Sequence, residues 1–295
     1  MKVLVFGARG QVGQMLRMTS PFPDVVFLDR AAVDLEDRAA IARALLAARP
    51  QVVINAAALT AVDRAEAEPS LAHAVNEAAP AAMAAACAGL GARLIHLSTD
   101  YVFDGGLRRP YRPDDLPHPC NVYGASKLAG ERRVRETRGL SHLILRTSWV
   151  YSHLARNFFF TVLELARRGG QLRVVADQIS SPTSAWTLAQ AIWRAARLPD
   201  CIGTAHFTDG AAISRHQFAL GILESAAERG LPFGQVPVDA ITSEQFSKEN
   251  AAVAPRPKYS VLDATEFRAR IGAEAPDWKR ELRAVMDRYA GEHHG

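Results

Sequence analysis

The chain has 295 residues, of which 48% are hydrophobic, and a mildly basic formal net charge of +4 at pH 7; it is long enough to bury a large core in one domain or two. No run of 18 apolar residues occurs, the start MKVLVFG has no signal-peptide pattern and the three cysteines have no CxxC spacing, so we expect a cytoplasmic protein with reduced thiols and no membrane span. The histidines form no HExxH or HxH pair and the basic residues form no dense run, which argues against a metal site and against nucleic acid as a partner.

Short apolar runs alternate with helical patterns through the first half of the chain. Strands are expected at residues 2–6, 25–28, 51–57, 92–99 and 141–148. Helices are expected at residues 11–18, 37–50, 71–91 and 121–138. Pro80 is expected to kink the third helix or to start a second segment there. Apolar strands alternating with helices predict βαβ units, so the expected fold class is α/β with a doubly wound parallel sheet.

The pattern is looser after about residue 151. Helices are expected at residues 157–169, 187–197 and 216–230, and short strands that return to the sheet at residues 172–176 and 203–207. The proline-rich segment VAPRPKYSVL, residues 253–262, is expected to be extended or looped. We therefore expect a first domain over residues 1–150, with the two return segments, and a smaller lobe formed mainly by residues 151–295.

A glycine-rich turn, GARGQVG, lies between the first expected strand and the first expected helix. Its GxxGxxG spacing allows a tight turn, close approach of the backbone to a pyrophosphate and close helix–strand packing, and the helix N-terminus favours phosphate. This predicts a Rossmann-type dinucleotide site; the alternative is a glycine-rich turn without a ligand. A P-loop is excluded because GxxxxGK[ST] is absent. The residues expected to contact the cofactor here are Gly7, Arg9, Gly10, Gln11, Val12 and Gly13.

The second strand ends VVFLDR, with Asp29 nineteen residues after Gly10. An acid there is suited to the adenosine ribose hydroxyls of NAD, whereas Arg30 and Arg9 are suited to the extra phosphate of NADP. We expect NADPH, with NADH tolerated, although Asp29 and Arg30 favour opposite cofactors. The residues expected near the adenine are Asp34 and Leu35. Those expected under the pyrophosphate and the nicotinamide ribose are Ala56, Ala57, Ala58, Leu59 and Thr60.

The stretch NVYGASK places Tyr123 and Lys127 four residues apart at the start of an expected helix, so that both side chains leave one face. Alone, such a pair can equally be part of a solvated face. Thr99, however, ends the fourth strand at the carboxyl edge of the sheet, where ligands bind in doubly wound folds and where its hydroxyl can bind a carbonyl oxygen. We therefore predict Thr99, Tyr123 and Lys127 as catalytic residues.

The chain resembles the extended short-chain dehydrogenases and, within them, the dTDP-4-dehydrorhamnose reductases. The resemblance is carried in order by FGARGQVG, VVINAAALTAVDRAEAEP, STDYVFDG, NVYGASKLAGE, LRTSWVY, DQISSPT and RPKYSVL. It implies hydride transfer from a nicotinamide to the C4 ketone of dTDP-4-dehydro-β-L-rhamnose, a nucleotide sugar, giving dTDP-β-L-rhamnose for surface polysaccharide.

The resemblance also implies a role for each catalytic residue. Tyr123 would donate the proton to the C4 alkoxide, Lys127 would hold the nicotinamide ribose and lower the pKa of Tyr123, and Thr99 would polarise the carbonyl. Asp100 and Trp149 would line the sugar site. Arg256, in RPKYSVL, is a candidate for the nucleotide diphosphate, and an ordinary solvated arginine is the alternative.

Two departures from related patterns affect these expectations. Some members of the family dimerise through a magnesium ion bound by an acidic residue just after the glycine turn, but Gln14 and Met15 stand there, so a magnesium-bridged dimer is not expected. We expect a monomer or a weak homodimer.

Nucleotide-sugar dehydratases carry an Asp-Glu pair after the strand-end threonine, whereas this chain has Asp100-Tyr101, which favours reduction. Two alternatives stay open: another nucleotide-sugar reductase or epimerase, and a non-catalytic cofactor-binding regulatory subunit.

Overall fold

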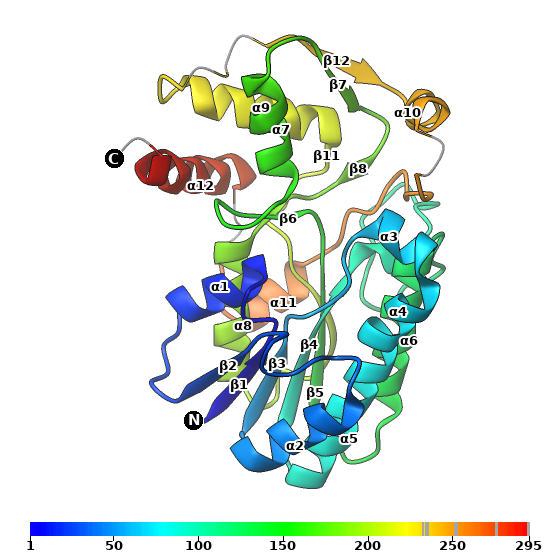
Figure 1. Ribbon diagram of the computed structural model, residues 1–295, viewed down its shortest axis with the longest axis vertical. Coiled ribbons are helices and arrows are strands. Elements are labelled where there is room, and N and C mark those ends of the chain that lie inside the picture. The colour runs from blue at the N-terminus through cyan, green and yellow to red at the C-terminus, as the bar shows by residue number, and fades with distance from the viewer. Residues whose placement is uncertain (232, 234–235, 251–252, 275–276, 294–295) are drawn as a thin grey trace.

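The computed structural model describes the chain except for residues 232, 234–235, 251–252, 275–276 and 294–295. Within it, six parallel strands form one sheet in the order β10-β5-β4-β3-β1-β2 (Figure 1). These strands are β1 (Val3–Phe6), β2 (Val25–Leu28), β3 (Val52–Asn55), β4 (Arg93–Thr99), β5 (His142–Thr147) and β10 (Gly203–His206). The predicted doubly wound parallel sheet is confirmed.

Alternate residues of the strands enter two hydrophobic cores, because successive side chains point to opposite faces of a sheet. Val3 and Val5 pack with one group of helices, and Leu4 and Phe6 pack with the other. The first group is α1 (Gln11–Met18), α8 (Ala185–Ala196) and α11 (Thr265–Arg270). The second group is α2 (Arg38–Ala48), α5 (Ala79–Leu90) and α6 (Val122–Glu136). Both faces of the sheet are therefore covered.

The strand order reverses between β1 and β3, because β2 lies on one side of β1 and β3 on the other. In open parallel sheets, ligands bind outside the carboxyl ends of the strands at such a reversal. The carboxyl ends here are the glycine-rich turn after β1, Asn55 at the end of β3 and Thr99 at the end of β4. The topology thus selects the edge of the sheet at which a ligand site is expected.

A second lobe lies beyond this edge and has its own hydrophobic core (Figure 1). It contains α7 (Phe158–Arg167), α9 (Arg215–Ala227) and α12 (Trp278–His293). It also contains β7 (Leu172–Val175), paired in parallel with β12 (Val238–Ile241), and the helix α10 (Ser243–Glu249). The chain crosses between the two bodies repeatedly after residue 150, since α8, β10 and α11 pack on the main sheet.

The prediction that residues 172–176 return to the main sheet is wrong. Leu172 and Val174 pack in the core of the second lobe, and β7 pairs with β12. The other predicted return segment does join the sheet, where β10 pairs with β5. Apolar strands of four residues carry no pattern that distinguishes one core from another, so only the fold assigns each of them.

The remaining elements join the two bodies. The alanine-rich stretch divides into α4 (Pro69–His73), a π-helical turn (Ala74–Ala78) and α5, with Pro80 in the first turn of α5. The short connections are α3 (Val62–Ala67), a 3₁₀ turn (Asp100–Val102), and the paired strands β6 (Val150–Tyr151) with β9 (Thr183–Ser184) and β8 (Ile179–Ser180) with β11 (Ile213–Ser214). Residues 253–262 are extended, as predicted, and bridge to Ile179 and Tyr111. In the part of the chain described, no helix is both long and apolar enough for a membrane span.

Candidate active site

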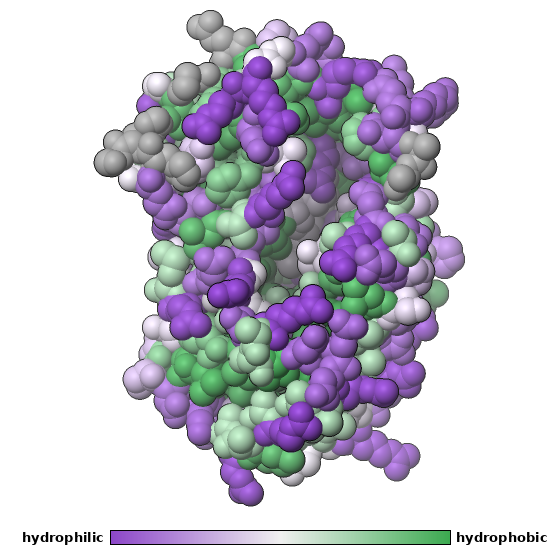
Figure 2. All heavy atoms as spheres, in the orientation of Figure 1, coloured by the Kyte–Doolittle hydropathy of each residue, from purple (hydrophilic) through white to green (hydrophobic). Residues whose placement is uncertain are grey.

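A cavity of about 710 Å³ lies between the sheet edge and the second lobe. On the face seen in Figure 2 the surface is hollowed between the two bodies. The predicted residues that line the cavity are Gly7, Arg9, Gly10, Gln11, Val12, Asp29, Arg30, Asp34, Leu35, Ala56, Ala57, Ala58, Leu59, Thr60, Thr99, Asp100, Tyr123, Lys127 and Trp149. Gly13 and Arg256 are not among the lining residues. Its wall thus combines the glycine turn, the strand ends and the start of α6.

In the glycine turn, the backbone packs so closely at Gly7 and Gly13 that a side chain at either position would clash with neighbouring backbone atoms. Gly7 has φ of +89°, and a Cβ built on it would lie 2.7 Å from the backbone nitrogen of Ala57. A Cβ on Gly13 would lie 2.1 Å from the carbonyl oxygen of Gly7, so Gly13 packs α1 against the turn from behind. Gly10 is the N-cap of α1 and no side chain caps the helix, which leaves N–H groups directed at the cavity. This turn fits the pyrophosphate of a dinucleotide.

The acid and the two arginines expected at the adenosine end are already paired with one another or with neighbouring carboxylates. Arg9 lies 3.1 Å from Asp29, and Asp29 also accepts a hydrogen bond from the backbone N–H of Ala32. Arg30 lies 3.6 Å from Asp34 and 3.1 Å from Glu36. Both arginines are exposed, so a phosphate can compete for them.

The three predicted catalytic residues come together from two elements. Thr99 ends β4, while Tyr123 and Lys127 lie on the first two turns of α6, whose N-cap Asn121 accepts a hydrogen bond from the backbone N–H of Gly124 at 2.7 Å. A Cβ on Gly124 would lie 2.0 Å from the carbonyl oxygen of Tyr101. Glycine at this position therefore lets the helix approach the chain that follows Thr99, which brings the Tyr123 phenol to the Thr99 hydroxyl.

The direction of the pKa shift of Tyr123 differs from the expectation. Burial raises the pKa of Tyr123, the hydrogen bond with Thr99 lowers it only in part, and Lys127 has no resolved effect on it. Nζ of Lys127 instead donates to the carbonyl oxygen of Leu97 at 2.7 Å. Burial also lowers the pKa of Lys127 to about 8. The phenol is therefore held in its protonated form, which is the form a proton donor requires.

Asp100 is buried beneath the catalytic residues and linked to the second lobe. Its carboxylate accepts hydrogen bonds from the hydroxyls of Thr99 at 3.1 Å, Ser180 at 3.2 Å and Ser260 at 2.5 Å. Burial raises the pKa of Asp100 to about 6. Because the Thr99 hydroxyl donates to Asp100 and its oxygen accepts from the backbone N–H of Tyr101 at 3.2 Å, one lone pair of that oxygen is left for Tyr123. Asp100 thus orients Thr99 and fixes the second lobe to the sheet edge.

Arg215 also lines the cavity, and the sequence did not single it out. Its guanidinium lies 4.1 Å from the ring centroid of Trp149 and 5.0 Å from that of Phe158. Burial lowers its pKa, and within the described residues no carboxylate lies within ion-pair distance of it. Trp149 itself has φ of +43°, a backbone conformation that costs energy for a residue with a side chain. A partly desolvated cation against an aromatic ring is suited to an anionic ligand.

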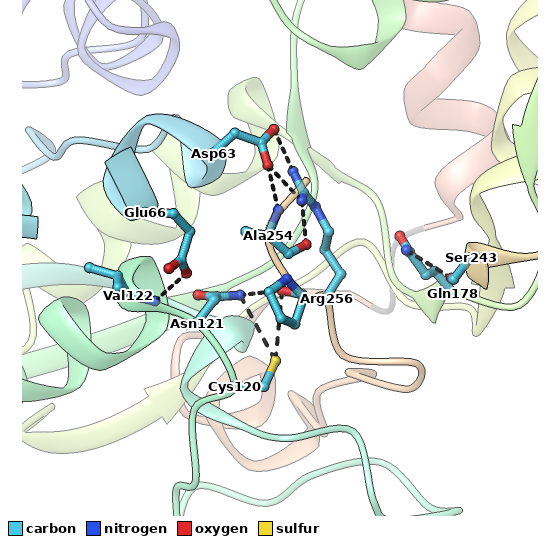
Figure 3. Close-up of polar contacts among 10 residues, drawn as sticks. Asp63, Glu66, Cys120, Asn121, Val122, Gln178, Ser243, Ala254 and Arg256 are labelled. Carbon is cyan, nitrogen blue, oxygen red and sulfur yellow. Dashed lines mark hydrogen bonds and ion pairs between the residues drawn. The ribbon is translucent and has the colours of Figure 1, made fainter. Parts of the chain in front are cut away.

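Arg256, the candidate for the nucleotide diphosphate, does not line the cavity and is paired with a carboxylate. It forms a two-pronged ion pair with Asp63 of α3, with both nitrogen–oxygen distances 2.8 Å, and also donates to the carbonyl oxygen of Ala254 (Figure 3). It therefore fastens the extended segment 253–262 to the first body. The Tyr101 phenol interacts with both Arg256 and Arg215, so Arg256 lies one side chain behind the cavity wall.

Comparison with known proteins identifies the family. A family model described as the RmlD substrate binding domain matches residues 1–290. The dTDP-4-dehydrorhamnose reductase of Burkholderia thailandensis is 40% identical over 290 residues, which is 95% of this chain and 96% of that protein. The chain belongs to the dTDP-4-dehydrorhamnose reductase family. The resemblance drawn from the sequence motifs is thus confirmed.

Two further members match this chain over nearly their whole length. The dTDP-4-dehydrorhamnose reductase of Shigella flexneri is 36% identical over 97% of this chain and 97% of its own. The crystal structure of the reductase from Bacillus anthracis, in complex with NADP, has a TM-score of 0.88 and 33% identity, covering 97% of this chain and 99% of that chain. The match spans both bodies of the fold, so the family assignment applies to the second lobe as well as to the glycine turn.

Proposed function

We propose that this protein reduces the C4 ketone of dTDP-4-dehydro-β-L-rhamnose to the alcohol of dTDP-β-L-rhamnose, with NADPH as reductant and NADH accepted. The observation that carries the proposal is the single cavity in which a glycine cradle meets Thr99, Tyr123 and Lys127. Relatives named for this reaction match nearly the whole chain. A cavity of about 710 Å³ also has the volume that ligand pockets usually have.

The cofactor site follows from the shape of the turn. Gly7 and Gly10 provide room and N–H groups for the pyrophosphate, and Asp29 lies where ribose hydroxyls bind in this fold. Arg9 and Arg30 lie beside Asp29 and are suited to a 2′-phosphate. When bound, the nicotinamide supplies a hydride to the ketone carbon.

The residues of the chain supply the proton and the polarisation. The Thr99 hydroxyl and the Tyr123 phenol line the same part of the cavity. When its hydroxyl turns from Asp100 to the substrate, Thr99 can donate a hydrogen bond to the ketone oxygen, which receives the proton of Tyr123 as negative charge develops on it. The raised pKa of Tyr123 keeps that proton available at neutral pH. Lys127, beside them on α6, lines the same cavity, and we assign it to the hydroxyls of the nicotinamide ribose.

Arg215 is the residue that we assign to the diphosphate of the substrate, and Trp149 beside it is assigned to the sugar. Arg215→Gln is expected to raise the KM for the nucleotide sugar by roughly tenfold to a hundredfold with a smaller change in kcat, because a hydrogen bond to a charged group contributes about 1.5–3 kcal/mol. Steady-state kinetics at saturating NADPH measure this.

Arg256→Gln is the matched comparison, since it removes a neighbouring guanidinium that is paired with Asp63. If Arg215 is the diphosphate contact, the KM should rise more in Arg215→Gln than in Arg256→Gln. The reverse order would return the role to Arg256, as the sequence alone indicated.

A panel of 4-keto nucleotide sugars tests the proposed function. The purified chain should oxidise NADPH with dTDP-4-dehydrorhamnose, and at a higher kcat/KM than with 4-keto sugars that carry another nucleotide or another stereochemistry. Measuring kcat/KM for NADPH and for NADH gives the cofactor preference. Turnover only with a different member of the panel would show another reductase of the same fold, and no turnover with any of them would contradict the proposal.

A further inference from the structure

A chain of hydrogen bonds reaches Lys127 from β3 and β4, on the face of the sheet that α6 covers. The backbone N–H of Ala57 donates to Oδ1 of Asn55 at 3.1 Å, Nδ2 of Asn55 lies 3.0 Å from Nδ1 of His96, and Nε2 of His96 lies 3.4 Å from Nζ of Lys127. Asn55 and His96 stand opposite each other on β3 and β4. Asn55, His96 and Lys127 are 1%, 0% and 2% exposed. The chain is therefore closed to bulk water.

The backbone fixes the direction of this chain. The N–H of Ala57 can only donate, so the oxygen of the Asn55 amide must face it, and the NH₂ group of Asn55 must then face His96. Nδ1 of His96 consequently accepts, and in a neutral imidazole the single proton lies on Nε2. His96 is neutral at physiological pH because burial, and then Lys127, lower its pKa. The Nε2–H group thus points at the lysine.

A donor that points at Lys127 distinguishes between the two protonation states of the amine. An ammonium group has three donors and no acceptor, so it cannot bond to Nε2–H, whereas a neutral amine accepts that bond through its lone pair. If the Asn55 amide were turned and the His96 proton moved to Nδ1, the lysine would face a lone pair on Nε2. The NH₂ group of Asn55 would then face the N–H of Ala57, so two donors would still oppose each other at another point of the chain. The arrangement therefore penalises the ammonium wherever the amide is turned.

We propose that Asn55 and His96 are positioning residues that hold an N–H donor against the Lys127 amine and so favour its neutral form in the free protein. The direction of the chain follows from the structure alone, while the importance of Lys127 for catalysis rests on the proposed function. A lysine that changes protonation near neutral pH can both give and take a proton at the cavity, whereas an ordinary lysine stays charged.

The other titratable groups around Lys127 are few. On its own helix are Tyr123, which is held neutral, and Glu131, whose charge raises the pKa of Lys127. Glu131 is itself paired with Arg146 of β5 at 2.7 Å, which offsets part of its field at the lysine. From β4, the carbonyl oxygen of Leu97 accepts a hydrogen bond from the amine at 2.7 Å, and His96 is the titratable residue of that strand that contacts it. Burial then dominates and brings the pKa of Lys127 to about 8.

The substitution Asn55→Asp is expected to reverse the direction of the hydrogen bond between residue 55 and His96, and it changes the size of the side chain very little. A carboxylate at residue 55 still accepts from Ala57, but it also accepts from Nδ1 of His96, which moves the imidazole proton to Nδ1 and presents a lone pair at Nε2 to the lysine. The pKa of Lys127 is then expected to rise toward the ordinary value for lysine. Asn76→Asp is the matched control, because Asn76 is also a buried amide beside α6 but bonds Leu59 and Ser126 rather than His96.

The test is nitrogen NMR on the full-length protein labelled at histidine and lysine, with no substrate present. Wild type and Asn76→Asp should show His96 as the Nε2–H tautomer, and Asn55→Asp at pH 8 should show Nδ1–H; His96→Gln identifies the resonance. The titration of Lys127, identified by Lys127→Met, should move to higher pH in Asn55→Asp alone. An Nδ1–H tautomer in wild type, or a Lys127 titration that is the same in wild type and Asn55→Asp, would overturn the proposal. Neither readout depends on the reductase assay, so the two proposals fail separately.

Discussion

Replacing Tyr123 with phenylalanine is expected to lower kcat for ketone reduction by a factor between about a hundred and ten thousand, the usual contribution of a positioned general acid. The hydroxyl is the only atom removed, and the ring keeps its edge contact with Tyr101, whose centroid lies 5.7 Å away. Because the phenol forms no part of the glycine cradle, cofactor affinity should change little. Steady-state kinetics and a fluorescence titration with NADPH measure the two effects.

Tyr111→Phe provides the control for loss of a buried phenol. Tyr111 is also buried, but its hydroxyl donates to Asp104 and it lies outside the cavity wall. Its loss should leave kcat within a few-fold of the wild-type value. If Tyr123→Phe keeps a similar rate, the proton comes from another donor, and the assignment of the general acid is wrong.

The sheet was predictable because most of its strands are short apolar runs and helices separate them. Four-residue runs such as VLVF and VVFL are apolar throughout, and Pro50 and Pro80 lie where the helices end or begin. The second lobe was harder to predict from the sequence. The four strands that join it to the first body, β6, β8, β9 and β11, have two residues each, which is too short to show a periodic pattern. Which of these strands pair depends on the loops between them, and the sequence pattern does not predict the conformation of those loops.

The candidate site likewise contains residues that the sequence predicted and residues that it did not predict. Gly7, Asp29, Thr99 and the tyrosine–lysine pair follow strand ends or helix starts, and their positions along the chain therefore predicted that they share an edge of the sheet. Arg215 has no such signal, since it only follows the N-cap Ser214 of α9. Its surroundings are set by Trp149, 66 residues earlier in the printed sequence, and only the folded chain brings the two together.

His96 and Glu131 were missed for a related reason. Each is polar and sits in an otherwise apolar core, where a sequence pattern can indicate burial but not a partner. Ser98 donates to Glu131 at 2.6 Å, and Arg146 donates to it from Nε at 2.8 Å and from Nη2 at 2.7 Å. These contacts join α6, β4 and β5, so they depend on the packing of three elements at once.

A large loss of stability is expected when the hydrogen bonds of Glu131 with Ser98 and Arg146 are removed. Glu131→Ala should lower the free energy of unfolding by about 3–5 kcal/mol, the cost of leaving one member of a buried ion pair alone. Glu131 and Arg146 are 0% and 1% exposed, so water cannot solvate the arginine that remains. Glu131→Gln should cost less, because the amide oxygen can still accept one of the hydrogen bonds. Urea denaturation of the three proteins measures the difference.

Glu68→Ala is the matched control, because Glu68 pairs with Arg64 on the surface at 2.9 Å. Exposed pairs contribute little, and this variant should unfold at nearly the wild-type urea concentration. An equally small effect in Glu131→Ala would mean that Arg146 finds another partner, and that the network does not hold α6 against the sheet. Glu131 lies one turn after Lys127 on α6 and accepts a hydrogen bond from Ser98 of β4, the strand that ends in Thr99. A large effect would therefore show that a buried charge fixes the helix carrying Tyr123 and Lys127 against the sheet.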